Sequence, residues 1–194
     1  MWLNRSKESL TLDVKYPDAR EVMRRLLDGT DVFVQNLVPG ASTRLGLSAT
    51  VLREAHPLLI VCEISGYGSS GPYRDRKAYD LLIQAEAGLV SITGTADEPV
   101  KVAISVADIA AGMYAYSGIL TALLMRYQTG AGTVLEVSML EALGEWMGYP
   151  VYYGTDGGAE PPPPHGRAPC GDRSLRPVRR WRWGGGLPRS PERA

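Results

Sequence analysis

Asp108 is the side chain in this sequence whose type and setting best suit chemistry. It follows a strand-like apolar segment, 99–106, and opens a long helix that we predict to reach about Tyr127. Exposed amide groups at a helix N-terminus favour an ionised carboxylate. Two interpretations are therefore open. Asp108 caps the helix, or it is a nucleophile whose oxygen attacks an acyl carbon.

The other reactive residue types have simpler explanations. His56 ends a helix just before Pro57, which predicts an interaction at the helix C-terminus. Cys62 lies inside an apolar strand, where a thiol behaves as a small hydrophobic group. With two cysteines and two histidines in the whole chain, neither a disulfide framework nor a zinc site is expected. We therefore expect no metal.

The net charge and the polar N-terminal segment limit the possible partners and the localisation of the protein. The 194 residues carry 21 basic and 21 acidic side chains, so the formal net charge is zero. A nucleic-acid-binding protein normally has a basic excess, and we expect no nucleic-acid partner. The polar start, MWLNRSKESLTLDVK, lacks the apolar core of a signal peptide. These features predict a cytoplasmic protein.

Strands and helices alternate along the first part of the chain. Alternation of this kind predicts an α/β protein with a doubly wound, Rossmann-like parallel sheet, of which this chain holds a part. The loop 66–80 is long and rich in Gly, Ser and Tyr, and ligands bind such sheets at loops of this kind. The predicted strands are 9–14, 31–37 and 58–65, with helices at 17–27, 48–56 and 79–90.

The stretch 109–125 carries no charged side chain, so a membrane span has to be weighed against a buried helix. Its 17 residues are at the lower limit for spanning a bilayer, and Gly, Ser, Thr and Tyr dilute its hydrophobicity. Small residues favour a long helix packed closely in a core or a subunit interface; they are Ala110, Ala111, Gly112, Ala115 and Gly118. We expect no membrane segment. A turn, a short strand and a helix are predicted to follow in 129–143.

The last 34 residues differ from the rest in composition. Residues 161–194 have a charge balance of +6, against −6 for residues 1–160, and are rich in Arg, Pro and Gly. One interpretation is a disordered basic tail. The other is a frameshift in a G+C-rich gene. One legal set of codons for 167–194, read one nucleotide along, gives APHAATAAYGPFAAGDGGAVFLGLQNER, which has ordinary turn and strand patterns.

Five blocks in order carry a family resemblance. They are NRSKESLTLDVK (4–15), DVFVQNLVPGASTRLGL (31–47), LIVCEISGYGSSGPYRDRKAYD (59–80), ISVADIAAGMYA (104–115) and RYQTGAGTVLEVSMLEAL (126–143). The chain thereby resembles the family III CoA-transferases, the group that contains formyl-CoA transferase, carnitine CoA-transferase and α-methylacyl-CoA racemase. The resemblance implies an interlocked homodimer for the intact family member.

The resemblance also implies a mechanism. Asp108 falls on the family's aspartate, which attacks the thioester of an acyl-CoA and forms first a mixed anhydride and then an aspartyl-CoA thioester. Coenzyme A or acyl-CoA is then a substrate, together with a small carboxylic acid. The acceptor that we expect is a small dicarboxylate, because 141–153 resembles the branch that handles these acids.

The same resemblance implies a CoA-binding set. Arg44 would pair with CoA phosphates, although Arg44 paired with surface acids and Lys77 in solvent are alternatives. The set comprises Leu12, Asp13, Val14, Lys15, Asn36, Leu37, Val38, Ala41, Arg44, Lys77, Ala78, Tyr79 and Asp80.

Tyr79 helps to separate the branches of the family. The resemblance implies that members of the racemase branch have a histidine at this position, which acts as a base. Tyrosine, with an ordinary pKa of about 10, is a poor base at neutral pH. We therefore favour a transferase. A racemase relative and a non-catalytic binding protein with a basic tail are the alternatives.

The resemblance implies that family members begin with a further strand–helix unit and end with a further C-terminal part, and we expect this chain to lack both. We predict residues 1–150 as a partial large domain, 151–160 as a connector and 161–194 as the frameshifted or disordered tail. We expect the fragment to have little or no activity alone.

Overall fold

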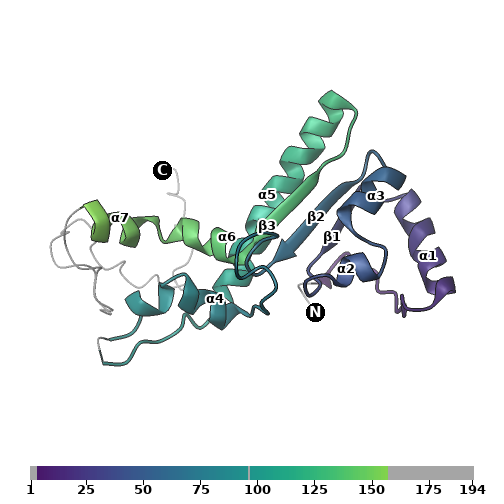
Figure 1. Ribbon diagram of the computed structural model, residues 1–194. Helices are drawn as coiled ribbons and strands as arrows, with labels where there is room; N and C mark the ends of the chain where they lie inside the picture. The colour runs from purple at the N-terminus through teal and green to yellow at the C-terminus, as the bar shows by residue number, and fades with distance from the viewer. Residues whose placement is uncertain (1–3, 96, 157–194) are drawn as a thin grey trace, which may run out of the picture.

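A sheet of three parallel strands, in the order β1-β2-β3, forms the centre of the molecule (Figure 1). The computed structural model describes residues 4–95 and 97–156. Val61 in the central strand is in register with Phe33 on one side and Val134 on the other. The strands are β1 (Val32–Gln35), β2 (Ile60–Ser65) and β3 (Val134–Ser138).

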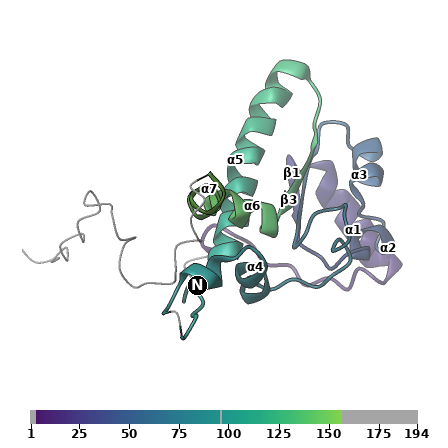
Figure 2. The same cartoon turned by 60° about the vertical axis from the view of Figure 1, so that its left-hand side comes forward.

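Helices cover both faces of this sheet (Figure 2). α1 and α3 pack on one face, where Leu27, Leu52 and Val61 form a buried cluster. α5 packs on the other face, where Ala110 and Ala111 lie in one cluster with Ile64 of β2 and Val137 of β3. The helices are α1 (Pro17–Asp28), α2 (Ala41–Arg44), α3 (Ala49–Ala55), α4 (Asp80–Glu86), the 3₁₀ turn η2 (Leu89–Ile92), α5 (Val106–Thr129), α6 (Met139–Trp146) and α7 (Gly148–Asp156). The predicted doubly wound α/β architecture is confirmed.

Local sequence signals set several of these boundaries. The Ser48 hydroxyl accepts a hydrogen bond from the Val51 amide at 3.5 Å and caps α3, as its position predicted. His56 ends the same helix, and its amide donates to Leu52 O at 2.8 Å. Gly130 ends α5 with φ of 68°, a conformation that glycine adopts without a steric cost.

Two predicted strands are wrong. Residues 9–14 are irregular, and no described strand pairs with them, so their apolar alternation has no sheet to join. Residues 99–106 form no strand beyond one bridge between Gly94 and Pro99. Within this segment the Gln84 side chain forms hydrogen bonds with both the amide and the carbonyl of Val102. A strand would need these backbone groups for hydrogen bonds to a neighbouring strand.

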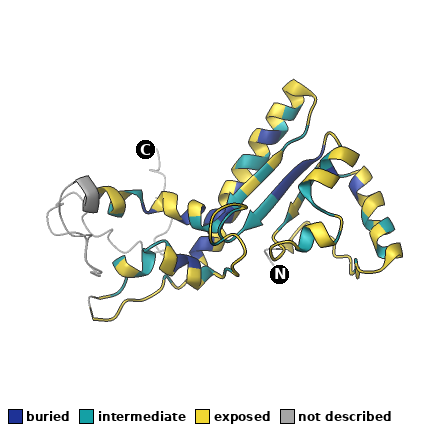
Figure 3. Cartoon of the chain, in the orientation of Figure 1, coloured by how far each residue is buried: buried dark blue, intermediate teal, exposed yellow. Residues whose placement is uncertain are grey.

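The long helix α5 is buried along one face only (Figure 3). Its small residues face the sheet, whereas large apolar side chains on the other side are exposed. α5 is also the one described helix that is long and apolar enough to cross a membrane by length and composition. α7 runs across the predicted boundary at residue 150, and the tail 161–194 lies outside the described residues.

Candidate active site

Asp108 lies in the first turn of α5, at the edge of the sheet where the parallel strands end. Two residues further along, Ala110 packs in the cluster that contains Ile64 and Val137 from the ends of β2 and β3. The N-cap position belongs to Ser105, and in the described chain no amide donates to the Asp108 carboxylate. The interpretation of Asp108 as the helix cap therefore finds no hydrogen bond to support it.

The environment of Asp108 raises its pKa. Loss of solvation is the larger cause, and the negative charge of Asp80 adds to it. The helix N-terminus acts in the opposite direction, since it favours the ionised form. The side chain is nevertheless exposed, so a carboxylate of increased basicity is available to a ligand.

Asp80, the first residue of α4, holds the start of α5. Its Oδ1 accepts a hydrogen bond from the Ala107 amide at 2.9 Å, and its Oδ2 accepts one from Gln84 Nε2 at 2.7 Å. The Lys101 ammonium lies 3.9 Å from the same Oδ2. A carboxylate from a neighbouring helix thus satisfies an amide that α5 would otherwise leave without an intrahelical partner.

Gln84 joins the preceding loop to this arrangement. The side chain is fully buried, and its Oε1 accepts from the Val102 amide at 2.8 Å while Nε2 donates to Val102 O at 3.3 Å. Ile83 and Leu143 are buried beside it in one hydrophobic cluster with Val106. The position of Asp108 therefore depends on α4, the loop before α5 and α6 together.

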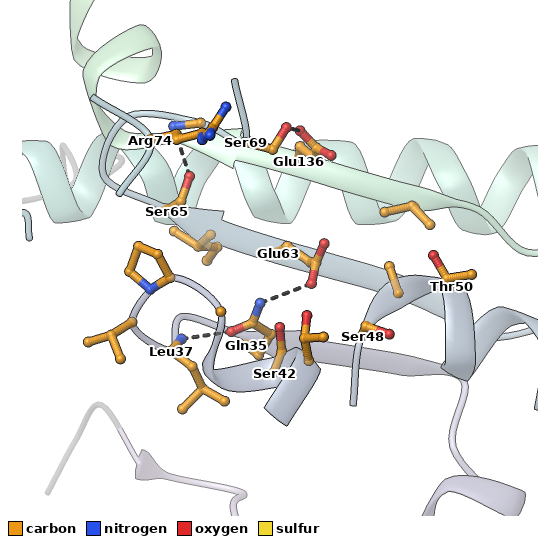
Figure 4. A pocket seen from close by; sticks show the side chains of 18 of the residues that line it. Gln35, Leu37, Ser42, Ser48, Thr50, Glu63, Ser65, Ser69, Arg74 and Glu136 are labelled. Atoms are coloured by element: carbon orange, nitrogen blue, oxygen red, sulfur yellow. Dashed lines mark hydrogen bonds between the residues drawn. The ribbon is translucent and has the colours of Figure 1, made fainter. Parts of the chain in front are cut away.

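The turn 36–44 follows β1 at the same edge of the sheet. Gln35 anchors it, because its Oε1 accepts from the Leu37 amide at 2.7 Å and its Nε2 donates to Glu63 Oε1 at 3.1 Å (Figure 4). Gly40 has φ of +73°, and the Arg44 guanidinium folds over it, so that a Cβ there would lie 2.9 Å from the Arg44 side chain. In the described chain no carboxylate pairs with Arg44, which leaves the guanidinium available for an anion.

A cavity of about 920 Å³ lies between this turn and the sheet. Leu37 and Val38 of the predicted set line it, together with Glu63 and Glu136, which are in register on neighbouring strands. Figure 4 shows the two carboxylates on one face of the sheet, with the Ser69 hydroxyl donating to Glu136. Carboxylates repel phosphate, so the wall formed by Glu63 and Glu136 does not suit the phosphates of CoA. Arg53 and Arg74, which also line the cavity, carry the positive charge that phosphates need.

The remaining predicted CoA-binding residues lie in two places. Ala78 packs against Gly66 at the end of β2, so closely that a Cβ on Gly66 would lie 2.1 Å from the Ala78 Cβ. Tyr79 and Lys77 beside it are exposed. Residues 12–15 form a local turn before α1, where Asp13 Oδ1 accepts from the Lys15 amide at 3.1 Å.

The structure thus brings Ala78 and Asp80 into contact with the helix that carries Asp108, and Leu37 and Val38 to the cavity. It shows no described contact that joins 12–15 to either group. The sequence prediction missed Gln84 and Gln35. For Gln84 a signal existed, because it is four residues after Asp80 on one helix, a spacing at which side chains meet.

A parallel sheet with a helix-borne carboxylate at its carboxyl edge is the arrangement of an α/β enzyme that binds its ligand in the crevice there. The family model described as CoA-transferase family III matches residues 1–180. The chain belongs to the family III CoA-transferases.

Sequence identity to named CoA-transferases supports this assignment. An acyl-CoA transferase of Fusarium pseudograminearum is 39% identical over 140 residues, which are 72% of this chain and 31% of that protein. A succinyl-CoA:glutarate CoA-transferase of Mus musculus is 37% identical over 141 residues, 72% of this chain and 32% of that protein. A formyl-CoA:oxalate CoA-transferase of Streptomyces avermitilis is 37% identical over 142 residues, 73% of this chain and 34% of that protein.

A solved structure gives the same result. The CAIB/BAIF family protein from Brucella suis superposes with a TM-score of 0.78 and 34% identity, over 81% of this chain and 42% of that one. The match to the curated relatives spans about a third of their length.

Proposed function

We propose that this chain contains the nucleophile-bearing part of an enzyme that transfers coenzyme A between an acyl-CoA and a small carboxylic acid. The observation that carries the proposal is Asp108, an exposed carboxylate of raised pKa held in the first turn of α5 by contacts from α4. Relatives named for succinyl-CoA, glutarate and oxalate support small dicarboxylates as the acceptors.

The proposed reaction proceeds by covalent exchange at one carboxylate. An Asp108 oxygen attacks the thioester carbon of the donor, the C–S bond breaks, and CoA thiolate leaves a mixed anhydride. The thiolate attacks the aspartyl carbon, which releases the donor acid and leaves an Asp108–CoA thioester. The acceptor carboxylate displaces the thiolate to form a second anhydride. The thiolate then attacks the acceptor acyl carbon and regenerates Asp108.

Arg44 is the proposed partner of the CoA phosphates. Its guanidinium is exposed on the turn after β1 and has no carboxylate partner among the described residues. A planar guanidinium binds phosphate oxygens in a fixed geometry. Tyr79, which is 67% exposed, supports transfer rather than racemisation, since a phenol is a much weaker base at neutral pH than the imidazole of a histidine.

The isolated 194-residue chain is proposed to have little activity. The outer edge of β1 has no partner strand in the described chain, and Val34 on it is half exposed. Large apolar side chains on α5 are also uncovered, among them Leu124 at 70% exposure. Surfaces of this kind are normally covered by more protein.

A chimeric enzyme tests the proposal. The aligned third of the Mus musculus succinyl-CoA:glutarate CoA-transferase is replaced by the aligned residues of this chain, and CoA exchange between succinyl-CoA and glutarate is measured. We expect exchange that falls at least about 1000-fold in Asp108→Asn. The exposed Asp18→Asn is the control and keeps the activity. A folded chimera whose exchange survives Asp108→Asn would refute the proposed nucleophile.

A further inference from the structure

Asp80 directs both of its carboxylate oxygens into the protein. The side chain is 13% exposed, and its partners are the Ala107 amide, the Gln84 amide group and the Lys101 ammonium. A carboxylate with this many internal partners has little capacity left for a ligand. We propose that Asp80 is a positioning residue that fixes the start of α5, and with it Asp108, rather than a contact for CoA. The inference rests on the nucleophilic role proposed for Asp108.

The start of α5 depends on this external partner. Ser105 is at the N-cap position, but its side chain makes no capping hydrogen bond. The amide that Asp80 accepts from belongs to Ala107, the residue directly before Asp108. A charge-assisted hydrogen bond at this point stabilises the first turn, where a helix without a cap would fray.

Gln84 extends the effect of Asp80 to the loop that leads into α5. Its amide group donates to Asp80 and to Val102 O, and it accepts from the Val102 amide. Because this side chain is fully buried, any loss of its partners leaves polar atoms without hydrogen bonds. Asp80, Gln84 and the loop therefore hold the first turn of α5 as one connected group.

Asp80 also affects Asp108 through its charge. The ionisable groups on the elements around the start of α5 include Lys101 in the preceding loop, Glu86 on α4, and Glu141 on α6. Of the described charged groups, Asp80 is the one whose charge raises the pKa of Asp108. A like charge nearby disfavours the ionised form and makes the carboxylate more basic.

The test uses the 194-residue chain and two substitutions of the same residue. Asp80→Ala removes both the hydrogen-bond acceptors and the charge, whereas Asp80→Asn keeps one acceptor and removes the charge. Two NMR measurements separate these effects: the hydrogen-exchange rate of the Ala107 amide, and the pKa of the Asp108 carboxyl. Asp18→Asn, which removes an exposed charge on α1, is the matched control.

We expect Asp80→Ala to speed exchange at the Ala107 amide about tenfold or more, and Asp80→Asn to speed it less. Both substitutions should lower the Asp108 pKa, and the control should change neither quantity. An unchanged Ala107 exchange rate in Asp80→Ala, or an unchanged Asp108 pKa in Asp80→Asn, would overturn the inference. If the alanine variant unfolds, the Ala107 exchange rate in Asp80→Asn decides alone, because a neutral amide oxygen accepts a weaker hydrogen bond than a carboxylate does. Neither measurement needs enzymatic activity, so failure here is distinguishable from failure of the proposed transferase reaction.

Discussion

The two sides of α5 differ in the size of their apolar side chains and in what covers them. The side that faces the sheet carries small residues, among them Ala110, Ala111 and Ala122, all buried. The other side carries large ones, such as Met113 and Leu124, and these are exposed. Small side chains let the helix lie close to the strands. The difference shows that an uncharged stretch can have one side packed in the core and the other side in contact with solvent.

The largest expected change in the free energy of unfolding comes from enlarging a side chain on the side of α5 that faces the sheet. Ala110 is fully buried in a cluster with Ala111 and Ala142, so Ala110→Leu should lower the free energy of unfolding by about 2 kcal/mol through overpacking. Urea denaturation measures the change.

Gly112→Leu is the matched control for this substitution. A Cβ at Gly112 would meet nothing within 4 Å, so the same leucine there should not destabilise the helix. Equal losses of stability at positions 110 and 112 would contradict the assigned difference between the two sides.

A smaller effect of the opposite sign is expected at Gly118. A Cβ there would lie 3.6 Å from Leu135 Cδ1, an ordinary van der Waals contact. Gly118→Ala should therefore raise the free energy of unfolding by about 0.5–1 kcal/mol, since glycine weakens a helix interior. Thermal unfolding followed by circular dichroism measures it. A lower melting temperature would show that the helix and β3 are packed more tightly than the structure describes.

On the exposed side, polar substitution should hardly change stability. Leu124→Gln should alter the free energy of unfolding by less than about 0.5 kcal/mol, because the leucine is largely in water already. It should also reduce self-association, which sedimentation velocity measures. A large loss of stability would mean that Leu124 is buried in the isolated chain.

A small effect that depends on pH is expected at Asp108, in the first turn of the helix. The folded chain holds a proton on Asp108 to higher pH than an unfolded one, whose pKa is near 3.8. Stability therefore falls as the pH rises above that value toward the folded pKa. Asp108→Asn removes this loss, and the melting temperature of the variant should exceed that of the wild type by roughly 1–2 °C at neutral pH. The difference should vanish at pH 3, and a difference that is constant with pH would contradict the raised pKa.

Local signals predicted much of the fold. The apolar run at 58–65 contains β2, Ser48 caps α3, and the long uncharged stretch is the greater part of α5. Non-local contacts were not predictable in this way. The segment 99–106 has the apolar alternation of a strand, but Gln84 takes its hydrogen bonds from 18 residues away. α5 also starts at Val106, two residues before the predicted start, because the carboxylate of Asp80 holds the Ala107 amide.

Part of the arrangement around Asp108 was predictable from the sequence, and the chemical role of Asp108 stays a prediction. The family resemblance pointed to Asp108, and the structure places it exposed at the carboxyl edge of the sheet. Asp80 was predicted to bind CoA, but nothing in the spacing of the sequence indicated that both of its oxygens have partners within the chain. The direction of a side chain depends on tertiary packing, and one sequence does not contain that information.

Covalent capture of the CoA intermediate tests the central claim most directly. The chimeric enzyme is incubated with succinyl-CoA without glutarate, digested, and analysed by mass spectrometry. We predict a CoA thioester on the peptide that contains Asp108, sensitive to hydroxylamine and missing from Asp108→Asn. An active chimera that carries CoA on another residue, or that transfers CoA with no covalent adduct, would contradict it.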